Sequence, residues 1–102
     1  MRASDRLNAL GLILPPAPKP VGSYLPAVRS ANLVFISGQL PLREGKVQYA
    51  GKVPTDVQLS DAVQAARMAV LNALAIAADV AGGIDQLQRI VRLGVFVNSA
   101  TG

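Results

Sequence analysis

The sequence predicts an α+β domain in which a small mixed β-sheet carries a helix on one face. Three observations lead to this fold class: short β-rich apolar runs precede and follow one long alanine-rich stretch, glycine and proline mark the boundaries, and no internal repeat is present. Of the 102 residues, 51% are hydrophobic and 16% are charged, which allows a buried core and excludes disorder as the main state. The length suffices for one domain and not for two.

Residues 1–23 are predicted to form an N-terminal helix and a proline-rich leader in front of the core. Residues 5–10 favour a short helix, which Gly11 ends. The run from Pro15 to Pro20 contains four prolines, which exclude helix and sheet and favour an extended polyproline segment. Such a segment is either a spacer or a strap across a partner surface, and the sequence leaves both interpretations open.

The core is predicted to occupy residues 24–102 and to begin with a β-hairpin. Its two strands are expected at residues 24–29 and 33–37, with a turn between them. Pro26 has no N–H to donate, so the first strand is expected to lie at a sheet edge or to be bulged. The continuous apolar run 33–36 is typical of a strand that is covered on both faces.

A short third strand is expected at residues 46–49, and a loop then leads to a long helix over residues 61–81. Ser60 is the predicted N-cap of this helix, and Asp61 suits the positive end of its dipole. Most of the helix's polar positions are expected to fall on one narrow stripe. The polar positions are Asp61, Gln64, Arg67, Asn72 and Asp79. The rest is apolar and must be covered by a sheet and something more. Arg and Asp are costly at membrane depth, so a buried soluble helix is expected rather than a membrane span.

The last predicted element is a long strand at residues 88–98. Gly82-Gly83 ends the helix, and residues 84–87 form a turn or one helical turn. Alternate side chains of the strand are mostly apolar on both faces, so both faces are expected to be covered. The strand–helix–strand crossover should be right-handed.

The residue types that are missing exclude several kinds of chemistry. The sequence has no Cys, His or Trp, so a Cys nucleophile, a disulfide framework, a thiolate zinc site and a His-based triad are impossible within it. Six carboxylates are scattered along the chain, which argues against a metal site: Asp5, Glu44, Asp56, Asp61, Asp79 and Asp85. The sequence also lacks both of the common glycine-rich phosphate-binding motifs.

The net charge of +4 is spread over the sequence rather than concentrated. The ten basic residues form no run and are not interleaved with aromatic side chains, so a solvated basic surface is favoured over a nucleic-acid interface. The N-terminus lacks the apolar core of a signal peptide. Together with the absence of Cys, this leads us to expect a cytoplasmic protein.

Two short stretches could line a ligand site. Tyr24 offers a phenol and an apolar ring, but by spacing alone it is equally a half-buried residue at the start of a strand. Ser37 and Gly38 close a buried strand and leave backbone N–H groups open to a ligand, or they mark a simple strand-to-loop transition. Arg89 and Arg92 could bind a carboxylate, although surface solvation explains them as well.

Several motifs occur along the chain in an order that resembles a known family. They are Pro20-Val21-Gly22-Ser23-Tyr24, Ser37-Gly38-Gln39-Leu40-Pro41, the helix pieces Ala65-Ala66 and Asn72-Ala73-Leu74, and Ile90-Val91-Arg92-Leu93 with Val95-Phe96-Val97-Asn98. Together they resemble the reactive-intermediate deaminase family, also called RidA, YjgF-like or L-PSP endoribonuclease-like. The resemblance covers nearly the whole sequence.

The resemblance implies a chorismate-mutase-like α+β fold and a homotrimer with three clefts between subunits. It also implies hydrolysis of enamines and imines of 2-oxo acids to 2-oxo acids and ammonia, with no metal and no cofactor. By the same resemblance, Tyr24 would pack against the substrate, and Ser37 and Gly38 would line the cleft, with the Gly38 N–H open to a carboxylate.

The sequence departs from the family in one respect. It has no counterpart of the family's substrate-clamping arginine or of its water-positioning glutamate, which lie in a C-terminal part that this sequence is expected to lack. No catalytic residue can therefore be assigned. The resemblance leaves two functions open: an impaired imine deaminase, or a non-catalytic oligomeric module that binds a small ligand or RNA, as a translation inhibitor would.

Overall fold

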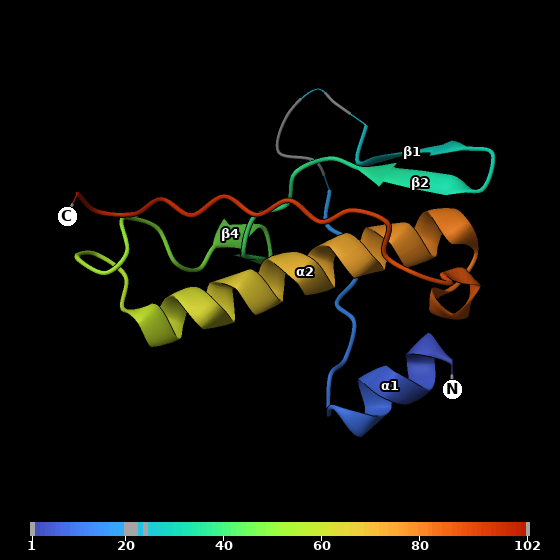
Figure 1. Cartoon of the computed structure of the whole chain (residues 1–102), viewed down its shortest axis with the longest axis horizontal. Helices are drawn as coiled ribbons and strands as arrows, with labels where there is room; N and C mark the ends of the chain where they lie inside the picture. Colours follow the sequence, from blue (N-terminus) through green and yellow to red (C-terminus); the bar gives the residue numbers. More distant parts are fainter. Residues whose placement is uncertain (1, 20–22, 24, 102) are drawn as a thin grey trace.

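The central element of the fold is the long helix α2, Leu59–Ala81, with 23 residues. The computed structural model describes residues 2–19, 23 and 25–101. In it, α2 contacts three strands of two β-hairpins, β1, β2 and β3, and the short 3₁₀ helix η1, Ile84–Gln86. A helix packed against strands confirms the predicted α+β class and the predicted helical turn after α2 (Figure 1).

The ends of α2 show one wrong and one correct prediction. The helix begins two residues earlier than expected, at Leu59, so Ser60 lies inside the first turn and is not the N-cap. The reason is that Gln58 is the last extended residue and its carbonyl already accepts the Ala62 N–H at 2.9 Å. Gly82 ends the helix as predicted, with a left-handed φ of +90° that suits glycine.

By length and composition α2 could cross a membrane, as can the core helix of a soluble protein. Its buried side chains are Asn72, Ala75, Ile76 and Ala77, and they lie along its C-terminal half. Only 22% of its most apolar 18 residues are buried, and Leu59 and Val63 are exposed, so the expectation of a helix buried along its length is wrong. The reason is that, among the described elements, two short hairpins, η1 and their loops cover only part of its surface.

The first hairpin pairs β1, Ala27–Ser30, with β2, Leu33–Ile36, in antiparallel register. The prediction of this hairpin is confirmed, and β1 begins directly after Pro26, whose ring nitrogen cannot donate to a ladder. The expectation that β2 is covered on both faces is wrong. Val34 and Ile36 are half-buried while Leu33 and Phe35 are exposed, because α2 covers only one face of the hairpin.

The second hairpin is smaller and consists of β3, Leu42–Arg43, and β4, Lys46–Val47. The short strand expected near residue 46 is therefore confirmed, while β3 was not predicted. Glu44 and Gly45 both adopt positive φ in the connecting turn, at 53° and 78°, which is the backbone twist that a two-residue hairpin loop requires.

The strand expected at residues 88–98 is not formed in the described part of the chain. The segment is extended and runs alongside α2 (Figure 1), but its only ladder-like contact is one parallel bridge between Val53 and Ser99. The Val53 N–H donates to the Asn98 carbonyl at 2.9 Å, and the Ala100 N–H donates to the Val53 carbonyl at 2.7 Å. No described strand is paired with the rest of the segment, so no continuous ladder forms.

The side chains of this segment are exposed, so the predicted cover on both faces is also wrong. Phe96 is 99% exposed, and its apolar neighbours are exposed as well: Ile90, Val91, Leu93, Val95 and Val97. In place of one mixed sheet with a crossover strand, the described residues form two separate two-stranded antiparallel sheets.

The N-terminal helix α1, Ala3–Ala9, starts two residues before the predicted helix and ends one residue before its predicted end. Figure 1 shows α1 on the opposite side of α2 from the β1–β2 hairpin, and α1 contacts η1. The leader that follows α1 forms no helix or strand over residues 12–19, as its prolines predict. Ala17 of the leader lies against the C-terminal end of α2, where it lines an open depression with Ala75 and Ala78.

Candidate functional site

The strand-end pair Ser37 and Gly38 follows β2 directly and is held by the start of the hairpin. The Ser37 N–H donates to the Pro26 carbonyl at 3.0 Å, and the Ser37 hydroxyl donates to the Leu25 carbonyl at 2.6 Å. The side-chain amide of Gln39 donates through its Nε2 to the Ser37 carbonyl at 2.9 Å. The Ser37 hydroxyl thus joins the end of β2 to the backbone of Leu25. This hydrogen bond indicates a structural role for Ser37 rather than a nucleophilic one.

Gly38 is the open position of this strand end. Its N–H donates to no acceptor among the described residues, and a Cβ added to it would meet nothing within 4 Å. Its φ is not in the left-handed region, so the backbone does not require glycine for its conformation. What glycine supplies here is space, which allows a ligand to approach the backbone closely.

Tyr24, the third residue predicted to line the site, lies outside the described residues, so its role stays a prediction. The structure does place its sequence neighbour Leu25 against Ser37. This hydrogen bond places Leu25, and no residue of the stretch 20–24, beside the strand end.

Asn72 is the residue of this site that sequence reasoning missed. The sequence grouped it with the polar stripe of the helix, but it is only 3% exposed. Its Nδ2 donates to the Leu40 and Leu42 carbonyls, both at 3.1 Å. These two carbonyls belong to the segment that follows Gly38 in the sequence. The available signal was its position, three and four residues before the apolar Ala75 and Ile76, which puts all three on one helix face.

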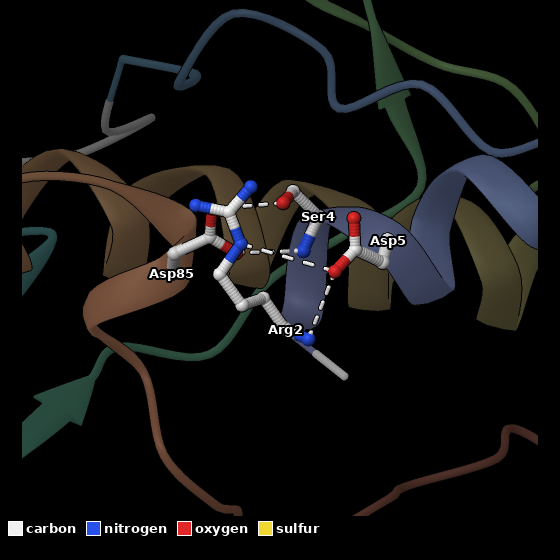
Figure 2. A network of polar contacts seen from close by, with 4 residues as sticks. All are labelled: Arg2, Ser4, Asp5 and Asp85. Carbon is white, nitrogen blue, oxygen red and sulfur yellow. Dashed lines mark hydrogen bonds and ion pairs between the residues drawn. The ribbon is translucent and has the colours of Figure 1, made fainter.

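A second polar cluster lies away from the strand end and joins α1 to η1 (Figure 2). The Ser4 N–H and the Ser4 hydroxyl each donate to a different oxygen of the Asp85 carboxylate, both at 2.8 Å. The Arg2 guanidinium lies 3.6 Å from Asp85, and the Arg2 N–H donates to Asp5 at 3.1 Å. Asp85 thereby caps the first turn of α1, although it lies 81 positions after Ser4 in the sequence.

These donors hold the pKa of Asp85 below its ordinary value. The main cause is the Ser4 backbone N–H, followed by the Ser4 hydroxyl, with a smaller contribution from the Arg2 charge; partial burial of the carboxyl acts in the opposite direction. The cluster favours an ionised Asp85, and its geometry serves to hold α1.

The two arginines considered as carboxylate binders, Arg89 and Arg92, are exposed on the extended segment. Neither forms an ion pair with a described carboxylate, since both ion pairs of the described chain involve Arg2. The structure does not bring them to Ser37 and Gly38 through any hydrogen bond or ion pair. Within the described ranges no three metal-ligating side chains converge.

Comparison with known proteins identifies the family of this chain. Residues 4–101 match the model of the family described as "YjgF/chorismate_mutase-like, putative endoribonuclease". The chain belongs to this family. Its α+β fold, with the helix α2 on the hairpins, is the YjgF fold, and the resemblance inferred from the sequence motifs is confirmed.

Individual relatives agree with the YjgF assignment. The chain is 31% identical over 99 residues to Protein TCP17 of Trypanosoma cruzi. It is similar to a crystal structure of a "putative endoribonuclease" from Shewanella oneidensis MR-1, with 33% identity over 82% of this chain and a TM-score of 0.74. It is also similar to protein Atu1372 of Agrobacterium tumefaciens, described as of unknown function, with 37% identity over 78% of this chain and a TM-score of 0.63.

These relatives are longer than the present chain. The match to TCP17 includes 97% of the present chain and 62% of TCP17. The chain covers 56% of the Shewanella chain and 46% of Atu1372. The chain therefore spans about half of the length of these two solved structures and somewhat more of TCP17.

Proposed function

We propose that this chain supplies the strand-end half of a small-ligand site that hydrolyses the imines or enamines of 2-oxo acids. The observation that carries the proposal is the open N–H of Gly38, which is fixed on one side by Ser37 and has no acceptor among the described residues. YjgF-family membership supports the choice of ligand, since the resemblance implies 2-imino acids as substrates.

In this proposal the Gly38 N–H donates to the substrate carboxylate, and Tyr24 packs against the substrate. Water adds to the C=N carbon to give a carbinolamine, whose C–N bond then breaks to release ammonia and leave a 2-oxo acid. Ser37 contributes by holding the Leu25 backbone, and so the approach to Tyr24, through its hydroxyl. Each role is a positioning or binding role, and no carboxylate or cationic side chain among the described residues is bonded to Ser37 or Gly38.

The 102 residues on their own are proposed to be a poor catalyst. The family's substrate-clamping arginine and water-positioning glutamate have no counterpart in them, and Arg89 and Arg92 are exposed. The only glutamate, Glu44, lies exposed in the turn between β3 and β4. An anion bound by one backbone N–H without an opposing cation is held weakly.

The assay follows directly from the proposed reaction. An amino-acid oxidase generates 2-iminopropanoate from alanine, and ammonia release is followed with and without the protein. We expect a rate close to the protein-free control, and a rate well above it would contradict the proposed impairment. Binding is tested separately by the amide NMR signal of Gly38, which should shift with pyruvate and not with acetone, which keeps the carbonyl group and lacks the carboxylate.

The proposed setting is a cytoplasmic homotrimer with its clefts between subunits. The exposed apolar side chains of the segment 88–98 and Phe35 of β2, 58% exposed, provide surface for a neighbouring subunit. Sedimentation equilibrium measures the state directly, and a clean folded monomer at micromolar concentration would contradict this part of the proposal.

An RNA-binding or endoribonuclease function is the second candidate. It is favoured by the description of the Shewanella structure as a "putative endoribonuclease", and the net charge of +4 permits contact with RNA. Salt-dependent retention of a single-stranded RNA at physiological ionic strength would support it. Retention lost already at low salt would leave the small-ligand site as the better explanation.

A further inference from the structure

The amide of Asn72 makes the contact that joins the site segment to the core helix. Its Nδ2 donates both of its hydrogens, one to the Leu40 carbonyl and one to the Leu42 carbonyl, each at 3.1 Å. Carbonyl oxygens only accept hydrogen bonds, so this contact fixes which way the amide points. Asn72 is 3% exposed, so water does not compete for these bonds.

The two acceptors flank Pro41, at the point where the chain leaves the strand end and enters β3. Around the same proline the Leu42 N–H donates to the Leu40 carbonyl at 2.8 Å, and the Gln48 N–H donates to the Pro41 carbonyl at 3.0 Å. These bonds shape the segment locally but do not attach it to α2. Pro41 itself has no N–H to contribute.

Gly38 therefore lies between two anchors. On one side Ser37 is bound to Leu25 and Pro26, and on the other side Leu40 and Leu42 are bound to Asn72. We infer that Asn72 is the positioning residue of the Ser37–Gly38 site. By binding the segment that follows Gly38, Asn72 holds the Gly38 N–H in one place relative to α2. This inference rests on the proposed ligand site for its meaning, while the anchoring itself is a property of the fold.

The unaltered chain allows a first test. The two side-chain amide protons of Asn72 should exchange with solvent at least tenfold more slowly than those of Asn32, an exposed asparagine in the β1–β2 turn. Equal exchange of the two side-chain amides would overturn the inference without any variant having to fold.

The second test replaces the donor by groups of nearly the same size. In Asn72→Asp the ionised carboxylate can only accept, so it faces two carbonyls with no hydrogen to share. We expect the protection of the Leu42 and Gln48 amides to fall about tenfold at neutral pH. The amide of Gly82, which donates to Ala78 at the end of α2, should keep its protection and reports that the helix is intact.

A change of pH distinguishes positioning from packing. Protonation gives the introduced carboxyl group one O–H donor, so protection of Leu42 and Gln48 in Asn72→Asp should partly return as pH falls. This return should begin above the ordinary aspartate pKa of about 4, because a buried carboxylate facing carbonyls has a raised pKa. Asn72→Leu, which fills the same space without a donor, should lose protection to the same extent at every pH.

The matched control is Asn32→Asp, which should change neither amide. Full protection in Asn72→Leu would show that volume alone is needed and would overturn the inference, as would an Asn72→Asp protein with unchanged protection at neutral pH. If protection falls as expected but pyruvate shifts no Gly38 signal in the unaltered chain, the proposed ligand is refuted and the anchoring role of Asn72 is retained.

Discussion

Two apolar runs of this chain have similar side-chain patterns and different fates. Residues 33–36 form β2, pair with β1 and turn Val34 and Ile36 toward α2. Six of the eight residues 90–97 are also branched apolar or aromatic, yet they stay unpaired and exposed. The pattern of side chains favours an extended backbone in both runs, but a strand also needs a partner for its N–H and C=O groups. A hairpin brings its own partner, whereas an isolated extended segment does not.

The largest effect is expected where the core helix supports the hairpins. Ile76→Ala should lower the free energy of unfolding by about 2–4 kcal/mol, because Ile76 is 3% exposed and its removal leaves a cavity. Urea denaturation followed by circular dichroism measures the change. The same substitution at Ile90, which is 66% exposed, serves as the control and should change stability by less than about 0.5 kcal/mol. Equal losses would show that residues 88–98 are packed.

A smaller effect is expected where the extended segment touches the rest of the chain. Gly51→Ala should cost about 1–3 kcal/mol, because Gly51 has a φ of +128° and an added Cβ would collide with the Asp56 Cβ. The change should also weaken the bridge between Val53 and Ser99 and raise exchange at the Val53 amide.

Gly38→Ala is the matched control for Gly51→Ala. An added Cβ at Gly38 meets nothing within 4 Å, and its φ is not left-handed, so stability should stay within about 0.5 kcal/mol. The same variant should reduce the pyruvate-induced shift at residue 38, since the methyl group occupies the approach to the N–H. A large loss of stability would mean that Gly38 is structural.

The attachment of α1 gives a third, more local effect. Because the pKa of Asp85 is lowered in the folded protein, the stability that it contributes is present above the ordinary aspartate pKa of about 4. It is lost as pH falls from there through the lowered folded value. The amide NMR signal of Ser4 should therefore move toward its free position only below pH 4, while β2 signals stay in place.

Asp85→Asn should partly detach α1 from η1 at neutral pH, since the charge of the carboxylate and one strong acceptor are lost. Trypsin cleavage after Arg6 then becomes faster, as mass spectrometry can measure. Asp79→Asn, a change on the exposed side of α2, is the control and should leave the cleavage rate unchanged. Unchanged cleavage in both variants would show that α1 is held by other contacts.

The smallest effect on stability and a clear effect on association are expected in the exposed run. Val95→Lys and Phe96→Lys should alter the free energy of unfolding by less than about 0.5 kcal/mol, because both side chains are exposed. They should reduce light scattering at high concentration, since charge in an unpaired apolar segment opposes edge-to-edge pairing. Unchanged scattering would remove this segment as the cause of association.

Much of the fold could be predicted from local signals in the sequence. The helix α2, its end at Gly82 and the β1–β2 hairpin depend on helical periodicity, glycine conformation and turn residues, all of which are local. The pairing of residues 88–98 could not be predicted, because the alternation of side chains does not reveal whether a partner strand is present. The start of α2 was misplaced because Ser60 is a favourable cap by type, while the backbone turns helical at Leu59.

The site divides in the same way. The strand end at Ser37 and Gly38 could be predicted because a small pair after an apolar run marks such an end, while ligand binding there stays a prediction. Asn72 was missed because its partners, Leu40 and Leu42, lie 32 and 30 positions away in the sequence. Only the packing of the chain onto α2 shows that this asparagine faces two carbonyls rather than solvent.

The bond between Ser4 and Asp85 also sets an order of events during synthesis. The helix α1 leaves the ribosome before its capping carboxylate, which follows 81 residues later. At about 5–20 residues per second this delay is roughly 4–16 s. A helix of seven residues does not persist alone in water, so α1 stays unformed through this interval. Helix α1 is thus made before η1 and folds only after it, and its docking reports that η1 is in place.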